Sequence, residues 1–157
     1  ARRSYSRSVA FSPVIRRMHV KAASIGPSPV AASLPAHFRN FDVRFCGDAL
    51  PISGATEPEL LAWVRLNDAS GVSPAAALLA LGDCLPPAAM ACFTAPAPIS
   101  SMTWAVDFAQ PAQHSAWYLQ RTRSLAAQDG YSFQIMEMWD ADGALVLVST
   151  QTVAIFA

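Results

Sequence analysis

One short segment, residues 73–83, constrains the fold of this chain more than any other part of the sequence. Ser73 is a favourable helix N-cap and Pro74 is tolerated at the first helical position, whereas the Leu-Pro-Pro run that follows cannot continue a helix. Between these ends Ala and Leu occupy every face, so the predicted helix has no polar stripe for water. About ten residues are too few to cross a bilayer, and a helix that is apolar all round must be enclosed by protein. We therefore expect a sheet curled around a central helix at about residues 74–83.

Asp83 stands at the C-terminal end of this helix. The helix dipole is negative there and favours a cation, so a carboxylate breaks a local rule without an evident structural gain. A residue of this kind is a candidate for function. We expect the apolar enclosure of the helix to surround Asp83 as well, and an ordinary surface turn is the alternative.

The composition excludes several classes of partner. With 157 residues and 53% hydrophobic content, the chain can bury a good core. Eleven basic and eleven acidic residues cancel, so no net charge draws the chain to nucleic acid or an anionic membrane. Cys46, Cys84 and Cys92 form neither a disulfide framework nor a metal-binding pattern with the histidines. We expect a cytoplasmic protein without a metal.

The N-terminal region differs from the rest in charge, because its first 41 residues hold seven Lys or Arg and no acidic residue. Residues 1–11 have the composition of an organelle transit peptide, but a loose alternation of apolar and polar residues favours a hairpin within residues 1–25. Residues 26–36 are rich in proline and are typical of a linker. The main domain is expected to span residues 37–157.

Apolar residues alternate with polar ones along most of the main domain, which predicts strands. Met102, Trp104 and Val106 give the clearest alternation, and they leave Ser101 on the opposite, polar face. The predicted strands span residues 41–46, 60–66, 101–108, 117–125, 131–139 and 145–156. Asp-Gly turns join the last three as hairpins. Two strands, one helix and four antiparallel strands describe an α+β hotdog fold, in which one curled sheet holds one buried helix.

Short motifs distributed over residues 38–157 support this fold. They are Phe41-Asp-Val-Arg, Ala62-Trp-Val-Arg-Leu, Leu81-Gly-Asp-Cys-Leu-Pro-Pro, Ser101-Met-Thr-Trp-Ala-Val-Asp-Phe-Ala-Gln-Pro, Trp117-Tyr-Leu, Asp142-Gly-Ala-Leu-Val and Ser149-Thr-Gln. In content and order they resemble the C-terminal repeat of the double-hotdog, type II (TesB-like) acyl-CoA thioesterases. Residues 1–25 resemble the final hairpin of the first repeat. The resemblance implies an incomplete first repeat, and pairing with another hotdog repeat or a second copy.

The resemblance also implies a catalytic site. Members of this family hydrolyse acyl-CoA with an Asp, a Thr or Ser, and a Gln that together hold a water. The matching positions are Asp83, Ser101 and Gln151, with Ser101 where Thr is usual. Asp83 would accept a proton from the water, and the hydroxyl and amide would fix its direction of attack. The family implies an acyl-CoA substrate, no cofactor and a place in fatty acid metabolism.

Other interpretations stay open. Arg121 and Arg123 share one face of a strand and are candidates to bind the phosphates of coenzyme A, although a solvated strand face is the commoner reason for such a pair. A non-catalytic hotdog that binds acyl-CoA or serves as an assembly module is the main alternative function. A hotdog dehydratase is less favoured, because none of the three histidines lies near the predicted helix.

Overall fold

The computed structural model describes residues 36–156. Its elements in chain order are η3 (Ala36–Asn40), β1 (Phe41–Phe45), β2 (Glu59–Leu66), α2 (Pro74–Gly82), η4 (Ala88–Cys92), β3 (Ile99–Phe108), β4 (Tyr118–Gln128), β5 (Tyr131–Asp140) and β6 (Leu145–Ile155). The hairpin expected in residues 1–25, and all but the last residue of the linker expected at 26–36, lie outside this range and stay predictions. No helix in the described range is long and apolar enough to cross a membrane.

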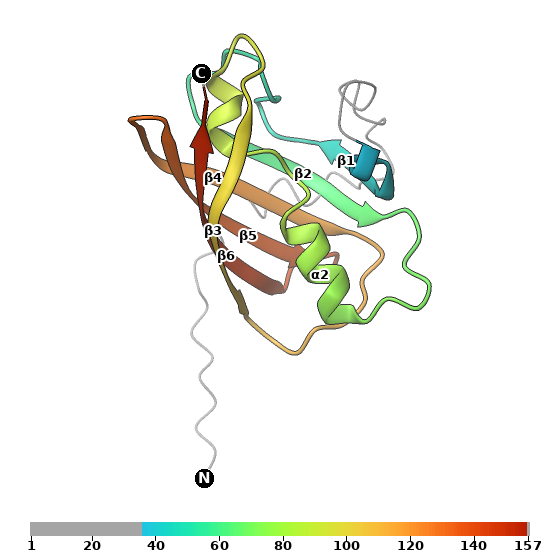
Figure 1. Cartoon of the computed structure of the whole chain (residues 1–157). Helices are drawn as coiled ribbons and strands as arrows, with labels where there is room; N and C mark the ends of the chain where they lie inside the picture. The colour runs from blue at the N-terminus through green and yellow to red at the C-terminus, as the bar shows by residue number, and fades with distance from the viewer. Residues whose placement is uncertain (1–35, 157) are drawn as a thin grey trace.

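The strands form a single six-stranded sheet in the order β1-β2-β4-β5-β6-β3, in which each neighbouring pair is antiparallel. Figure 1 shows the curled sheet with α2 lying across one of its faces. β3 follows α2 and η4 in sequence but pairs with β6, the last strand, so it forms one edge of the sheet. One helix against one curled antiparallel sheet confirms the predicted α+β hotdog fold.

The central helix α2 begins and ends where its sequence signals predict. Ser73 caps it, and the Ser73 hydroxyl accepts a hydrogen bond from the Ala76 backbone N–H at 3.3 Å. Only one side of the helix is buried: Ala77, Leu78, Leu81 and Gly82 face the sheet, whereas Ala75, Ala76, Leu79 and Ala80 are exposed. The expectation of a fully enclosed helix is therefore wrong in extent, because the sheet covers one helix face rather than wrapping both.

The main core lies between α2 and the face of the sheet that we call the inner face. Leu78 and Leu81 of α2 pack there with side chains from all six strands. The strand residues of this cluster, some of them only partly buried, are Phe41, Val43, Phe45, Ala62, Val64, Leu66, Val106, Tyr118, Met138, Val146 and Leu147. Burial of this apolar surface stabilises the fold and holds the C-terminal end of α2 against the sheet.

The opposite face of the sheet, the outer face, carries aromatic and charged side chains. Trp63 and Trp139 are buried there with Leu61 and Leu119. The guanidinium groups of Arg44 and Arg65 lie 4.7 Å and 4.3 Å from the centre of the Trp117 ring, and both bind Asp42. The hydrogen bond from Arg44 lowers the pKa of the Asp42 carboxyl, and the bond from Arg65 lowers it further.

The two predicted hairpins are both present. Asp129 and Gly130 join β4 to β5 with φ angles of 51° and 78°, the left-handed values that a tight type I′ turn requires. Between β5 and β6, the Asp140 carboxylate accepts hydrogen bonds from the backbone N–H groups of Asp142 and Ala144. These turns fix the register of the last three strands, and therefore the position of Gln151 opposite its neighbours in the sheet.

Candidate active site

Asp83 is the residue at which α2 ends. It occupies the C-cap position, and its backbone N–H still bonds the carbonyl of Leu79 at 3.3 Å. The last turn of α2 carries no basic residue, so nothing within the helix offsets the carboxylate at the negative end of the dipole. The Asp83 side chain is exposed, which corrects the expectation that the apolar enclosure would surround it. A small molecule in solution can therefore approach it.

Ser101 reaches the site through a β-bulge in β3. Ser101 pairs with Val153 and Thr103 pairs with Thr152, so Met102 is one extra residue between them. The bulge shifts the alternation and puts Ser101 on the same face as Trp104, which pairs with Gln151. The expectation that Ser101 lies on the face opposite Trp104 is wrong for this reason, since a sequence pattern of period two does not reveal a bulge.

Gln151 joins the two other residues. It lies on the inner face of β6, and only 4% of its surface is exposed. Its Nε2 amide donates one hydrogen bond to Asp83 Oδ1 at 3.0 Å and another to Ser101 Oγ at 2.8 Å. The structure thus brings together the three residues that the family resemblance singled out, from the end of a helix and from two neighbouring strands.

A second glutamine, which the sequence analysis missed, continues this network. Gln134 of β5 is fully buried and pairs with Gln151 across the β5–β6 ladder. Its Nε2 donates to Gln151 Oε1 at 2.7 Å, and its own Oε1 accepts from the Ala88 backbone N–H at 2.9 Å. The available signal was its spacing from Met136 and Met138, which marks the inner face, but a polar residue in a strand is ordinarily assigned to the solvent side.

Gln120, on the inner face of β4, holds the end of α2 by a hydrogen bond. Its Nε2 donates to the Gly82 carbonyl at 2.8 Å, and its Oε1 accepts a weaker bond from the Cys84 thiol at 3.6 Å. A side chain at Gly82 would meet the Trp104 ring, with a Cβ only 3.3 Å from the nearest ring carbon. Burial raises the pKa of the Cys84 thiol and the charge of Asp83 raises it further, so Cys84 stays protonated and is no nucleophile.

Arg121 and Arg123 do not join this site. Both lie on the outer face of β4, the face opposite Gln151. Arg121 binds the Glu137 carboxylate, with an Nε to Oε2 distance of 3.0 Å, and its guanidinium lies 5.9 Å from the centre of the Trp139 ring. The protein's own carboxylate therefore occupies Arg121, and the predicted role in binding phosphates stays untested.

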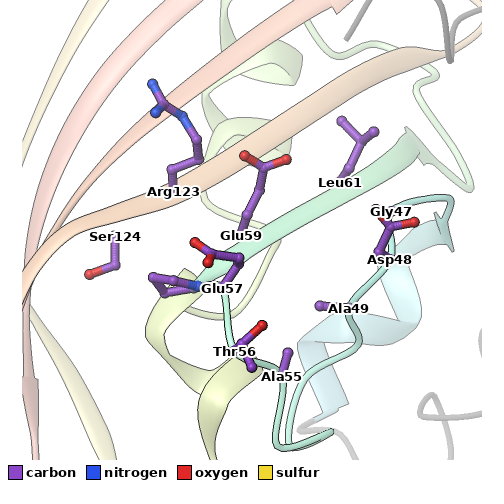
Figure 2. A pocket seen from close by; sticks show the side chains of 11 residues that line it. Gly47, Asp48, Ala49, Ala55, Thr56, Glu57, Glu59, Leu61, Arg123 and Ser124 are labelled. Atoms are coloured by element: carbon purple, nitrogen blue, oxygen red, sulfur yellow. The ribbon is translucent and has the colours of Figure 1, made fainter. Parts of the chain in front are cut away.

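Arg123 lines a pocket at the end of β2 (Figure 2). Arg123 and Glu59 are paired on neighbouring strands, and Asp48 and Glu57 line the same pocket. Three carboxylates and one guanidinium line this pocket, so its net negative charge favours a cation over a phosphate. The pocket is formed by the loop between β1 and β2 together with β2 and β4, and none of Asp83, Ser101 and Gln151 lines it.

The arrangement at Asp83 suits acid–base chemistry on a water. A carboxylate can take a proton, and the Ser101 hydroxyl, which accepts from Gln151, keeps its own hydrogen available to donate. Among residues 36–156, no group of three or more His, Cys, Asp or Glu side chains is arranged to hold a metal ion.

Comparison with protein families gives one match that covers most of the chain. The model of the acyl-CoA thioesterase C-terminal domain matches residues 18–155. A search of the curated proteins found no match. The family match agrees with the resemblance drawn from the sequence motifs.

Several solved structures share the fold. A hot dog fold protein of unknown function from Alicyclobacillus acidocaldarius is 25% identical, with a TM-score of 0.78, and the match covers 100% of this chain and 59% of that one. The acyl-CoA thioesterase II TesB2 from Mycobacterium marinum is 21% identical, with a TM-score of 0.60, and covers 83% of this chain and 55% of its own. A tesB protein from Mycobacterium avium subspecies paratuberculosis is 19% identical, with a TM-score of 0.61, over 96% of this chain and 57% of its own. This chain thus spans a little over half the length of these three proteins.

Proposed function

Because the chain belongs to the family of acyl-CoA thioesterase C-terminal domains, we propose that it hydrolyses the thioester of an acyl-CoA by direct attack of a water. The observation that carries the proposal is the pair of hydrogen bonds by which Gln151 Nε2 joins Asp83 Oδ1 and Ser101 Oγ. A carboxylate base and a hydroxyl are then held at one point, on the exposed side of the network. A thioester has a good leaving group, so one base and one oriented water suffice without a covalent serine intermediate.

The proposed reaction assigns a separate role to each residue. The water oxygen bonds to the thioester carbonyl carbon while Asp83 accepts a proton from the water. The Ser101 hydroxyl donates to the water and orients it. The C–S bond then breaks, and Asp83 passes the proton that it took from the water to the departing sulfur. The products are a carboxylic acid and the free thiol of coenzyme A. Both N–H groups of Gln151 are engaged, so Gln151 sets the spacing between Asp83 and Ser101 rather than contacting the water.

The direct test of the proposed function is release of coenzyme A thiol from acyl-CoA substrates of different chain lengths. We expect release from at least one of them, detected with a thiol reagent. The exposed Cys92 reacts with such a reagent, so each assay needs a blank without substrate. Absence of release from every acyl-CoA would contradict the proposal.

Replacement of Ser101 separates its hydroxyl from its backbone. We expect Ser101→Ala to lower kcat by roughly 10-fold to 100-fold, because the water loses one of the groups that orient it. Ser101→Thr keeps the hydroxyl and β-branching is favourable in a strand, so it should retain most of the activity. Steady-state kinetics of both variants measure the difference. Equal activity of the Ala and Thr variants would remove the hydroxyl from the mechanism.

The alternative function is a non-catalytic hotdog that binds acyl-CoA or serves as an assembly module. One observation favours a partner in either case: β3 is an edge strand, and Ile99, Met102 and Phe108 on it are exposed. We propose that this edge pairs with another hotdog repeat or a second copy of the chain, in a cytoplasmic protein of fatty acid metabolism. A melting temperature raised by acyl-CoA without release of thiol would favour the non-catalytic function.

A further inference from the structure

The inner face of the sheet carries glutamines where a hotdog core would ordinarily be apolar. Gln134 is 0% exposed and Gln151 is 4% exposed. A buried amide that lacks hydrogen-bond partners is costly, so glutamines at such positions need partners with defined directions. Gln134 has such partners. Its hydrogen bonds connect a backbone N–H of η4 with Gln151, which in turn bonds the other proposed catalytic residues.

The direction of the network follows from its first member. Ala88 begins η4, and the residue before it, Pro87, provides no side-chain cap for this helical turn. A peptide N–H can only donate, so the Gln134 atom 2.9 Å from the Ala88 nitrogen must be the amide oxygen. The other end of the Gln134 amide is then Nε2, which must donate to Gln151, and the Gln151 atom 2.7 Å away must be Oε1.

The orientation of the Gln151 amide is determined by the same reasoning. With Oε1 turned to Gln134, Gln151 presents Nε2 to Asp83 and Ser101. A rotated amide would instead place its carbonyl oxygen against the Asp83 carboxylate, and the two acceptors would repel each other. A sheet and a helix alone do not exclude this rotation, because the oxygen and nitrogen of an amide occupy nearly the same volume.

We propose that Gln134 is a positioning residue for the hydrolysis. Because Gln134 accepts a hydrogen bond from the Ala88 N–H, it donates one to Gln151 Oε1, and this keeps both N–H groups of Gln151 on Asp83 and Ser101. The proposal rests on the proposed function. Gln134 does not touch the substrate or the water, and acts only through Gln151. It also ties η4 to the catalytic residues, because the same amide that orients Gln151 satisfies the first N–H of η4.

Gln134→Glu tests this role with almost no change in side-chain volume. An ionised glutamate still accepts from the Ala88 N–H, but it cannot donate to Gln151 Oε1 and instead attracts the Gln151 N–H groups away from Asp83 and Ser101. A protonated glutamate regains the donor. We expect kcat at neutral or higher pH to fall on the order of 10-fold to 100-fold, with KM nearly unchanged.

The pH profile distinguishes positioning from a structural role. Burial is expected to raise the pKa of the introduced carboxyl, so the ratio of parent to variant kcat should shrink as pH falls through that pKa. The groups opposite residue 134 on the neighbouring strands, Ser124 and Gln151, do not titrate. The titratable groups at the end of α2 are Asp83, reached through Gln151, and Cys84, and the parent carries both of them.

A matched control is Thr122→Val. Thr122 is 0% exposed on the inner face of β4, the substitution keeps its shape, and its hydroxyl has no hydrogen-bond partner among the described residues. We expect this variant to keep the kcat of the parent at every pH. Side-chain amide signals in 15N-1H NMR spectra give a readout without activity: the Gln151 signals, assigned by their loss in Gln151→Leu, should shift in Gln134→Glu and stay in Thr122→Val.

The outcomes separate the two proposals. If the parent chain releases no thiol from any acyl-CoA, the proposed function fails. Unshifted Gln151 amide signals in Gln134→Glu would independently show that Gln134 does not orient the Gln151 amide, and would overturn the positioning role. If the parent is active, a Gln134→Glu variant with parental kcat at all pH values overturns the positioning role. A Gln134→Glu variant has a merely structural defect if its melting temperature falls and its kcat is reduced by the same factor at every pH. That result also overturns the positioning role.

Discussion

Asp83→Asn is expected to lower kcat for acyl-CoA hydrolysis by roughly 10²-fold to 10⁴-fold, the range that a general base ordinarily contributes. Asn has nearly the same shape, and its carbonyl oxygen can still accept the hydrogen bond from Gln151 Nε2. The network therefore persists while the proton acceptor is lost. The melting temperature should stay the same or rise slightly, because the substitution removes a negative charge from the negative end of the α2 dipole.

A matched control for Asp83→Asn is Asp107→Asn. Asp107 is an exposed carboxylate on β3, the strand that carries Ser101, and it pairs with Val148 rather than with any residue of the site. We expect this variant to hydrolyse acyl-CoA as the parent does. If Asp83→Asn also retained the parental kcat, Asp83 would not be the base.

Leu78→Ala is expected to lower the free energy of unfolding by about 2–5 kcal/mol. Leu78 is fully buried between α2 and the inner face of the sheet, so truncation leaves a cavity in the main core. The next residue along the helix, Leu79, is 37% exposed. Leu79→Ala should change the same quantity by less than about 1 kcal/mol, since exposed sites contribute little and Ala is a good helix former.

Denaturant titrations of the two leucine variants measure this contrast directly. The difference between adjacent residues tests whether one face of α2, rather than both, is covered in the folded protein. A loss at Leu79 as large as the loss at Leu78 would contradict the one-sided packing of α2, and would indicate that a second layer covers the exposed helix face.

The elements of the fold could be predicted because their signals are local. A capping Ser73, prolines after the helix and Asp-Gly turns each act over a few residues, and the structure has α2 and the two hairpins at those places. The degree of burial of α2 could not be predicted in this way. An all-apolar helix shows that burial is favourable, but the number of covering layers depends on contacts far away in the sequence.

The site was harder to predict than the fold, and two physical causes account for this. The β-bulge at Met102 shifts Ser101 to the inner face, and no local pattern in β3 announces it. At the start of β5 the burial is the reverse of what hydropathy predicts, since the aromatic Tyr131 and Phe133 are exposed whereas the polar Gln134 is buried. Hydrogen bonds outweigh hydropathy at Gln134, and those partners lie on η4 and β6. The family resemblance singled out Asp83, Ser101 and Gln151 but gave no indication of Gln134.

A single turnover in water enriched in 18O tests most directly whether Asp83 activates a water as a base or attacks the thioester carbon itself. With enzyme in excess over acyl-CoA, direct attack by water places one 18O atom in the carboxylic acid formed in the first turnover, and mass spectrometry of the acid detects it. We predict singly labelled acid and unlabelled Asp83. Unlabelled acid from the first turnover, with the label instead on the Asp83 carboxylate, would mean that Asp83 attacks the thioester itself through an anhydride and would contradict the account.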